Sequence, residues 1–287
     1  MPEGDTVYRA ARTLDAALAG KRLAVAELRV PSLAGVDLRG ERVLGTGTHG
    51  KHLFTRLSSD RSLHTHLGMD GSWRVRAGGR LPGLGRDAVR VLLQAEDGAV
   101  AIGAHLRVVE LLDARAEARV SGPLGPDPLR PSFDADEAVR RLAADPGRPI
   151  AAALLDQHCL AGLGNFWVSE VCFLRGYHPD RPVAACDLAA TVRLAARALT
   201  ASATRAGAYQ VTTGDTRRGR RSWVHGRAGL PCLRCGSVIV ARARLPGTCV
   251  PGDQHRLAGE RRCWWCPHCQ PAAHDAGGSA AGEGDGR

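Results

Sequence analysis

The chain has 287 residues, which is long for one ordinary domain and suits two domains with a small appendage. Hydrophobic residues make up 44 % and aromatic residues 4 %, so we expect a substantial core built mainly from Ala, Leu and Val. The formal net charge of +10 favours a polyanion such as nucleic acid as the partner, although an Arg-rich chain from a GC-rich genome would give the same value. No apolar run reaches about 18 residues, which argues against a membrane span.

The amino-terminal part predicts one helix followed by strands. Apolar residues recur at helical spacing over 4–19, with Asp5 and Thr6 at the expected cap and Gly20 at the end. Alternating runs separated by Gly and Pro then predict strands within 42–57, 63–76, 88–95 and 99–103. We therefore expect an antiparallel sandwich or barrel with a leading helix.

The remainder of the chain predicts a different architecture. Residues 121–132 hold four prolines and are typical of a linker, whereas helical spacing returns in 134–144, 149–157, 165–175 and 186–206. The tail from 272 has no apolar period and is expected to be disordered. The predicted division is an α+β arrangement with a sandwich domain (1–120), a linker (121–133), a helical domain (134–227), a cysteine-rich module (228–271) and a tail (272–287).

Six of the nine cysteines crowd into residues 232–269. Two Cys-x₂-Cys pairs, Cys232 with Cys235 and Cys266 with Cys269, are the pattern that supplies four thiolates to one tetrahedral Zn²⁺. Cys249 and Cys263 are alternatives for one of the four ligands. A redox role fits less well, because it needs one such pair beside a βαβ unit. We expect a structural metal without chemistry of its own.

Three short segments carry weaker signals. The Gly162-Leu-Gly-Asn165 turn opens a helix, whose free N–H groups are suited to binding a phosphate, although the turn could serve packing alone. Lys51 is predicted on a strand, where a lysine is usually a solvated surface residue. Met69 falls in a Gly-rich turn, where an exposed apolar side chain can fill the space left by a flipped nucleotide, although most methionines belong to the core.

The amino terminus offers a nucleophile. If Met1 is removed, Pro2 presents a secondary amine, and α-amino groups titrate near pH 8, so a useful fraction is neutral in the cell. Such an amine condenses with a sugar C1′ to give an iminium ion, which acidifies the C2′ hydrogen and permits β-elimination of the 3′ phosphate. The neighbouring Glu3 can donate a proton if its pKa is raised. A Pro at position 2 is, on its own, usually only a terminus.

Taken together, four motifs in order resemble the formamidopyrimidine-DNA glycosylase and endonuclease VIII family. The motifs are Met1-Pro2-Glu3-Gly4, Gly50-Lys51, the Gly162–Asn165 turn and the two Cys-x₂-Cys pairs followed by Gln, and they span about residues 2–271. The resemblance implies a β-sandwich domain, a helix-two-turn-helix domain and a β-hairpin zinc finger, with DNA between the two lobes. The composition suggests an actinobacterial type.

The resemblance also implies roles for individual residues. Pro2 is similar to the family's nucleophile and Glu3 to its acid, and Lys51 and Asn165 match residues that contact phosphate near the lesion. Met69 aligns with the wedge that enters the base stack. Arg261 matches the arginine of the finger that grips phosphate.

The branch of the family is indicated by mixed features. Gly4 resembles the endonuclease VIII branch, which favours oxidised pyrimidines, whereas the segment from His66 to Met69 resembles the formamidopyrimidine branch. The later wedge Phe of that second branch is missing from 104–108, so we favour endonuclease VIII. Two departures from the family stand out: Thr6 replaces a Glu found in many relatives, and a long insert separates Cys235 from Cys266.

The sequence therefore predicts a bifunctional DNA glycosylase and abasic-site lyase that acts on double-stranded DNA containing damaged bases or abasic sites. The absence of a secretory signal at the start favours the bacterial cytoplasm, at the nucleoid, and we expect a monomer. A non-catalytic relative that binds damaged DNA is the first alternative. A zinc-finger regulator is the second, and it lacks a helix with base-reading residues at suitable spacing.

Overall fold

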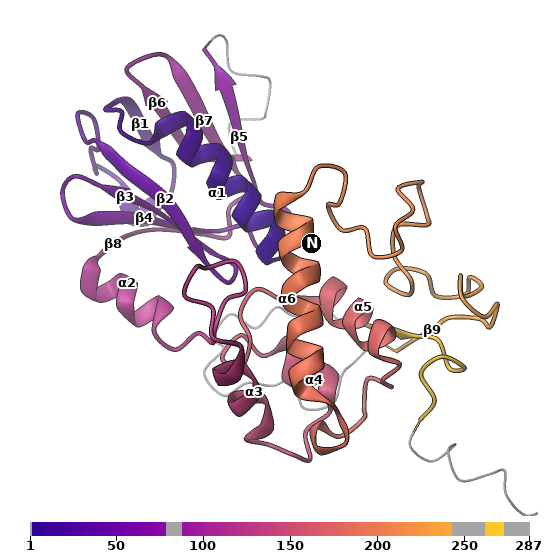
Figure 1. The fold of residues 1–287 in the computed structure, drawn as a ribbon. Coiled ribbons are helices and arrows are strands. Elements are labelled where there is room, and N and C mark those ends of the chain that lie inside the picture. The colour runs from indigo at the N-terminus through magenta and orange to yellow at the C-terminus, as the bar shows by residue number, and fades with distance from the viewer. Residues whose placement is uncertain (1, 79–87, 243–261, 273–287) are drawn as a thin grey trace, which may run out of the picture.

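The computed structural model describes residues 2–78, 88–242 and 262–272. The sequence predictions for Cys249, Arg261 and the tail after residue 272 fall outside these described residues. The chain forms two lobes, with most strands in one and most helices in the other (Figure 1). Among the described residues, none of the helices is both long and apolar enough to cross a lipid bilayer.

The first lobe is a sandwich of two antiparallel sheets of four strands each, in the orders β1-β6-β7-β5 and β2-β3-β4-β8. Its helix α1 (Gly4–Leu18) turns an apolar stripe onto the core between the sheets, as the helical spacing predicts. The strands are β1 (Leu23–Leu28), β2 (Val43–His49), β3 (His52–Leu57), β4 (Arg61–His66), β5 (Ser72–Ala77), β6 (Val89–Ala95), β7 (Ala99–Ala104) and β8 (Val108–Asp113). A short 3₁₀ turn, η1, occupies Pro31–Leu33, and α2 (Ala114–Ser121) follows β8.

The main corrections in this lobe concern turns. The run 42–57 is two strands, because Gly50 takes a left-handed φ of 57° and closes a tight hairpin. Lys51 therefore lies in that turn, and the predicted strand position is wrong. The run 63–76 is likewise interrupted, by the turn that carries Met69. Helix α1 begins one residue before its predicted cap, with Glu3 as its N-cap.

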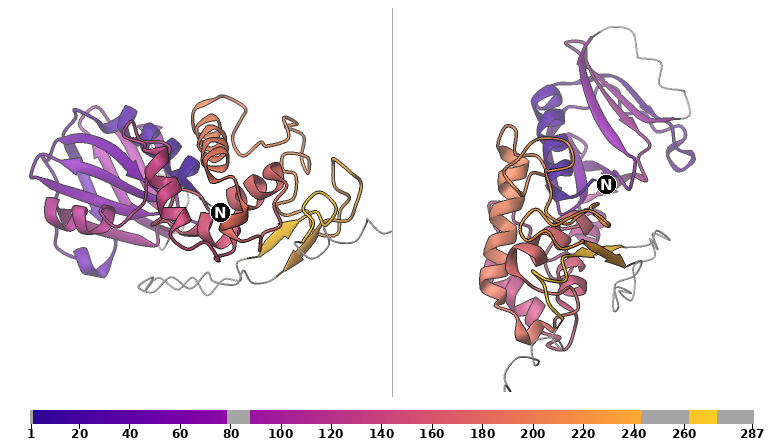
Figure 2. Two further views of the ribbon diagram at one scale, coloured as in Figure 1. Left: turned by 60° about the horizontal axis from the view of Figure 1, so that its bottom comes forward. Right: turned by 90° about the vertical axis from the view of Figure 1, so that its right-hand side faces the viewer.

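The second lobe is helical, as predicted. A core of apolar residues from all its helices surrounds the almost fully buried helix α5. The elements are α3 (Ala135–Ala143), α4 (Ile150–Leu155), α5 (Asn165–Arg175), the 3₁₀ turn η3 (Val183–Ala185) and α6 (Leu188–Thr204). The hairpin β9 (Val240–Arg242) and β10 (Cys263–Trp265) follows at the far end of this lobe (Figure 2).

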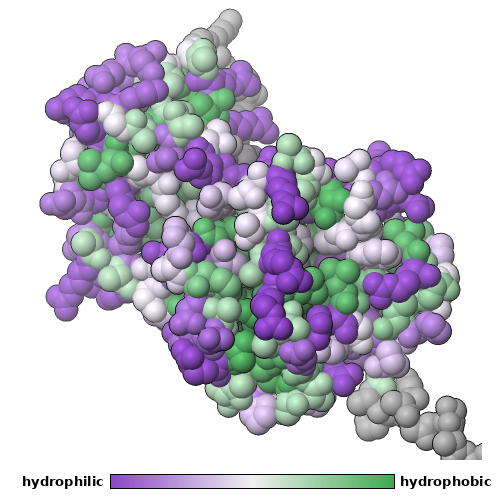
Figure 3. Space-filling model, viewed as in Figure 1, coloured by the Kyte–Doolittle hydropathy of each residue, from purple (hydrophilic) through white to green (hydrophobic). Residues whose placement is uncertain are grey.

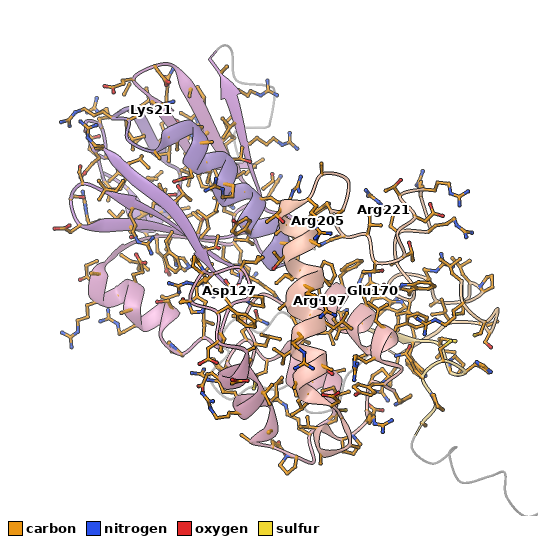
Figure 4. All side chains as sticks on the ribbon, in the orientation of Figure 1. Lys21, Asp127, Glu170, Arg197, Arg205 and Arg221 are labelled. Atoms are coloured by element: carbon orange, nitrogen blue, oxygen red, sulfur yellow. The ribbon has the colours of Figure 1, made fainter. Side chains whose placement is uncertain are left out.

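The two lobes share hydrogen bonds. Asp127 is buried in the proline-rich segment, where its Oδ2 accepts from the Gly50 N–H at 2.8 Å and its Oδ1 from the Leu129 N–H at 2.8 Å. His49 Nε2 lies 2.9 Å from the Gly125 carbonyl oxygen. Figure 4 shows Asp127 between the sheets and the helices. The predicted linker is thus bonded to the hairpin that carries Lys51.

The face viewed in Figure 3 bears hydrophilic side chains over both lobes. Arg197 on α6 belongs to this face (Figure 4), and it is exposed together with Arg193 one turn earlier. The guanidinium groups of these two residues add positive charge to this face.

Candidate active site at the junction of the lobes

Glu3 occupies the point where the two lobes meet. Its side chain is fully buried, and its carboxylate accepts hydrogen bonds from the N–H groups of Gly164 at 2.8 Å, Phe166 at 2.7 Å and Trp167 at 3.3 Å. These donors belong to the first turn of α5, whose free N–H groups carry partial positive charge. A residue at the start of the chain therefore sits at the N-terminus of a helix more than 160 positions away.

The glycines around Glu3 are required by close packing. The Gly4 N–H donates to the Gly162 carbonyl oxygen at 2.8 Å, and a Cβ on Gly4 would lie 2.8 Å from the Gly162 Cα. A Cβ on Gly164 would lie 2.4 Å from the Glu3 Cδ. Both distances are shorter than side chains tolerate, which explains why the Pro2-Glu3-Gly4 and Gly162–Asn165 motifs occur together.

Two opposing effects set the proton affinity of Glu3. Burial raises the pKa of the carboxyl group, while the charge of Lys51 and the hydrogen bond from Phe166 act against this and leave a net increase. Lys51 is thus close enough to interact with Glu3. A carboxyl group with a raised pKa can hold a proton for transfer near neutral pH.

Asp5 is a second buried carboxylate beside Glu3. Its Oδ2 accepts from the Ser202 hydroxyl at 2.6 Å and its Oδ1 from the Thr6 N–H at 2.8 Å, and burial raises its pKa despite these bonds. The hydroxyl oxygen of Thr6 lies 2.8 Å from that of Tyr209. Thr6 therefore joins the leading helix to the segment after α6.

The turns of Lys51 and Met69 lie at the same end of one sheet. His52 pairs with both His49 and His66 across the strands, which places the Gly50-Lys51 turn next to the turn that follows β4. The side chain of Met69 is 49 % exposed, one of the few large apolar side chains so open among the described residues. The structure therefore brings Lys51 and Met69, both selected from the sequence, to the same end of this sheet.

Asn165 is the first residue of α5 and is buried, and its Oδ1 has no hydrogen-bond partner within the described part of the chain. An unpaired buried amide oxygen is uncommon in native proteins. Pro2, by contrast, is only partly buried, next to the buried Glu3.

A cavity of about 220 Å³ opens beside Glu3. It is lined by residues that the sequence analysis did not select: Phe166, Tyr209, Gln210, Arg221, Ser222 and His225. The rings of Phe166 and His225 meet edge to face with centroids 5.2 Å apart, and burial lowers the pKa of His225 to about 4, which keeps that ring neutral. The cavity thus combines flat uncharged rings with polar groups.

The segment 209–225 has few apolar residues, and a buried carboxylate on α5 holds it in place. Glu170 accepts from the N–H groups of Trp223 at 2.8 Å, Val224 at 2.9 Å and His225 at 2.9 Å, and also from the Thr212 hydroxyl. Figure 4 shows Glu170 on α5 and Arg221 on the loop above it. The only sequence signal for Glu170 is an acidic residue within an otherwise apolar helix.

The four cysteines Cys232, Cys235, Cys266 and Cys269 come together with their Sγ atoms within 4.8 Å of one another. Four sulfurs each about 2.3 Å from one tetrahedral ion lie roughly 3.8 Å apart, so the cluster fits a metal ion. Cys263 is not a member, because it is buried in the core of the helical lobe. The structure thus brings together the four cysteines of the two predicted pairs, while Cys249 lies outside the described residues.

The side chain of Gln270 joins the four-cysteine module to the helical lobe by two hydrogen bonds. Its Oε1 accepts from the Cys266 N–H at 3.0 Å, and its Nε2 donates to the Tyr177 carbonyl oxygen at 2.7 Å. Cys232 and Cys266 also pack with Phe173 at the end of α5. The cysteine module and the Glu3 site thus share one helix, α5.

Comparison with known proteins identifies this architecture. The family models for the formamidopyrimidine-DNA glycosylase N-terminal domain and H2TH domain match residues 1–120 and 124–212. The crystal structure of Lactococcus lactis Fpg (MutM) with DNA containing N7-benzyl-Fapy-dG has a TM-score of 0.74 at 23 % identity, covering 94 % of this chain and 100 % of that one, and so shares the fold.

Curated relatives extend over nearly the whole chain. A protein of Mycolicibacterium smegmatis named DNA-(apurinic or apyrimidinic site) lyase Nei2 is 42 % identical, covering 95 % of this chain and 100 % of that protein. A probable endonuclease 8 2 of Streptomyces coelicolor is 45 % identical, covering 96 % and 97 %. Endonuclease 8 of Escherichia coli is 32 % identical, covering 94 % and 100 %. The chain therefore belongs to the formamidopyrimidine-DNA glycosylase and endonuclease VIII family, in its actinobacterial endonuclease VIII branch.

Proposed function

We propose that this chain is a bifunctional DNA glycosylase and abasic-site lyase of base excision repair, which removes oxidised bases, chiefly pyrimidines, from double-stranded DNA and nicks the strand. The observation that carries the proposal is the buried Glu3 carboxylate, which follows Pro2 in the chain, is held at the N-terminus of α5 and lines a cavity of about 220 Å³. Its family membership and the names of its relatives support the same activity.

In the proposed reaction, the Pro2 nitrogen, freed by removal of Met1, forms a bond to C1′ of the damaged nucleotide. Glu3 donates its proton to the ring oxygen, which opens the sugar, and the bond between C1′ and the base breaks as the base takes up a proton. The resulting iminium ion acidifies C2′–H. Loss of that proton breaks the C3′–O bond and releases the 3′ phosphate, and water then hydrolyses the iminium.

The remaining predicted residues act on the DNA in this proposal. Lys51 and Asn165 bind phosphates near the lesion, Arg261 grips the backbone from the finger, and Met69 fills the gap in the base stack. Extrusion of a nucleotide costs a few kcal/mol, and this cost is lower for a damaged base that pairs weakly. The four thiolates hold one structural Zn²⁺, which orders the finger, and the chain works as a monomer on chromosomal DNA.

Borohydride trapping tests the proposal. A duplex with one thymine glycol, dihydrouracil or abasic site, treated with the protein and borohydride, should give a stable protein–DNA adduct, and peptide mapping should locate it at Pro2. A chain that binds the same duplexes without any adduct or strand cleavage would instead be a damage-binding protein without chemistry.

A further inference from the structure

Gln210 lies in the cavity beside Glu3 with an unusual backbone. Its φ of 49° falls in the left-handed region, which non-glycine residues seldom adopt. Its N–H donates to the Ser202 hydroxyl at 2.9 Å, and that same hydroxyl donates to Asp5. Strained residues that persist in this way cluster at functional sites, because the surrounding structure holds them there.

The amide nitrogen of the Gln210 side chain is unpaired within the described part of the chain. This Nε2 atom is buried and makes no hydrogen bond among the described residues. An amide offers two donors and an acceptor, and leaving a buried donor unpaired is unfavourable, so native proteins rarely do so without a reason. Gln210 therefore lines the cavity while its amide nitrogen lacks a hydrogen-bond partner among the described residues.

The other groups of the cavity indicate what that ligand is. Phe166 and the neutral ring of His225 offer flat surfaces, and the volume of about 220 Å³ suits a small ring system. A base that is flipped into a pocket is usually read by stacking and by hydrogen bonds to its pairing edge.

We infer that Gln210 is a specificity-determining residue that reads the pairing edge of the extruded base. This inference rests on the proposed function. The Nε2 donates to a ring carbonyl oxygen and the Oε1 accepts from the adjacent ring N–H, as an amide does when it pairs with a base edge. The ligand class is an oxidised or saturated pyrimidine that keeps an intact N3–H beside a carbonyl group, such as dihydrothymine.

The test compares two variants and three substrates under single-turnover conditions. Gln210→Gly removes the amide and accepts the left-handed backbone without strain, whereas Gln210→Asn keeps an amide on a residue that also tolerates this conformation. The substrates are duplexes with dihydrothymine, with N3-methyl-dihydrothymine, whose pairing edge is blocked, and with an abasic site, which has no base to read.

For Gln210→Gly we expect base removal from dihydrothymine DNA to fall about ten- to a hundredfold, with abasic-site cleavage unchanged within about twofold. Gln210→Asn should retain part of the activity. The wild-type protein should discriminate against the methylated base, and Gln210→Gly should no longer do so.

An equal loss on the abasic duplex would show that Gln210 supports the structure, which would overturn the inference. Undiminished discrimination against the methylated base by Gln210→Gly would overturn it as well. Absence of cleavage by the wild-type protein on all three substrates would instead refute the proposed function itself.

Discussion

At the scale of single residues, the proposed chemistry depends on the Glu3 carboxyl group, which is buried and accepts hydrogen bonds from α5. We expect Glu3→Gln to abolish base excision while lesion binding is kept, because an amide cannot donate the proton that opens the sugar. Quenched cleavage assays with thymine glycol DNA and anisotropy titrations measure the two properties separately. Base excision at the wild-type rate would remove Glu3 from its proposed role.

The raised pKa of Glu3 also affects stability. Because burial raises this pKa above its usual value of 4.5, the folded chain binds the proton more tightly than the unfolded chain does. The resulting stabilisation is fully present below pH 4.5 and is lost as the pH rises through the folded-state pKa.

Urea unfolding at a series of pH values checks this sign. From pH 4.5 upward, the free energy of unfolding of the wild-type protein should fall more than that of Glu3→Gln, which has no proton to lose at this position. Parallel curves for the two proteins would contradict the expected linkage. Asp5, whose pKa is also raised, is common to both proteins and cancels in the comparison.

At the scale of elements, the N-terminus of α5 requires glycine at position 164, because a side chain there would overlap Glu3. Gly164→Ala places a Cβ 2.4 Å from the Glu3 Cδ, so we expect the carboxylate to shift and the free energy of unfolding to fall by about 1–3 kcal/mol. The rate of base excision should fall by more than the loss of folded protein explains. Gly147→Ala is the matched control, because its nearest neighbour is a side-chain atom 4.0 Å away, and it should behave as wild type.

The loop 209–225 depends on α5 in a similar way. Glu170→Ala leaves three N–H groups without an acceptor, that of the buried Val224 among them, so we expect a loss of about 3 kcal/mol in the free energy of unfolding, or a disordered loop. Denaturant titration and hydrogen exchange of Trp223 to His225 measure these effects. Glu137→Gln removes only surface ion pairs and should lower the free energy of unfolding far less than Glu170→Ala does. Equal costs for the two variants would show that Glu170 does not hold the loop.

The sequence predicted the elements better than their connections. Helix α5 matches its predicted range of 165–175, because the Gly162–Asn165 turn and Gly176 mark both ends. The turn at Lys51 is not evident from the sequence, because the alternation of apolar and polar residues continues through a two-residue turn. Strands β1 and β8 were missed for lack of a clear period.

The residues of the candidate site also differ in how well the sequence predicts them. Glu3 and the four cysteines lie in compact motifs, so one sequence was enough to select them. Gln210 and His225 come from a segment without periodicity, and long-range hydrogen bonds to Ser202 and Glu170 hold them at their common cavity. Such tertiary contacts leave no mark in the local pattern of residues.

At the scale of the whole molecule, the cysteine cluster should control whether the finger is ordered. We expect one Zn²⁺ per chain by elemental analysis. Cys266→Ser should lose the ion and weaken DNA binding, because removal of one thiolate opens the tetrahedral set. Cys263→Ser is the matched control: it alters a buried core cysteine and should keep the ion even if stability drops. Loss of zinc from the Cys263 variant alone would reassign the ligand.

The bonds from Glu3 to the first turn of α5, and from Gly4 to Gly162, have a consequence for the evolution and engineering of this protein. Glu3 belongs to the first family domain and the N–H groups that bind its carboxylate belong to the second, so in the proposed reaction neither domain holds the acid site by itself. Recombination that replaced one domain with that of a distant relative would have to preserve Gly4, Gly162 and Gly164, which pack closely around Glu3. The two halves are therefore expected to be inherited, and to diverge, as one unit.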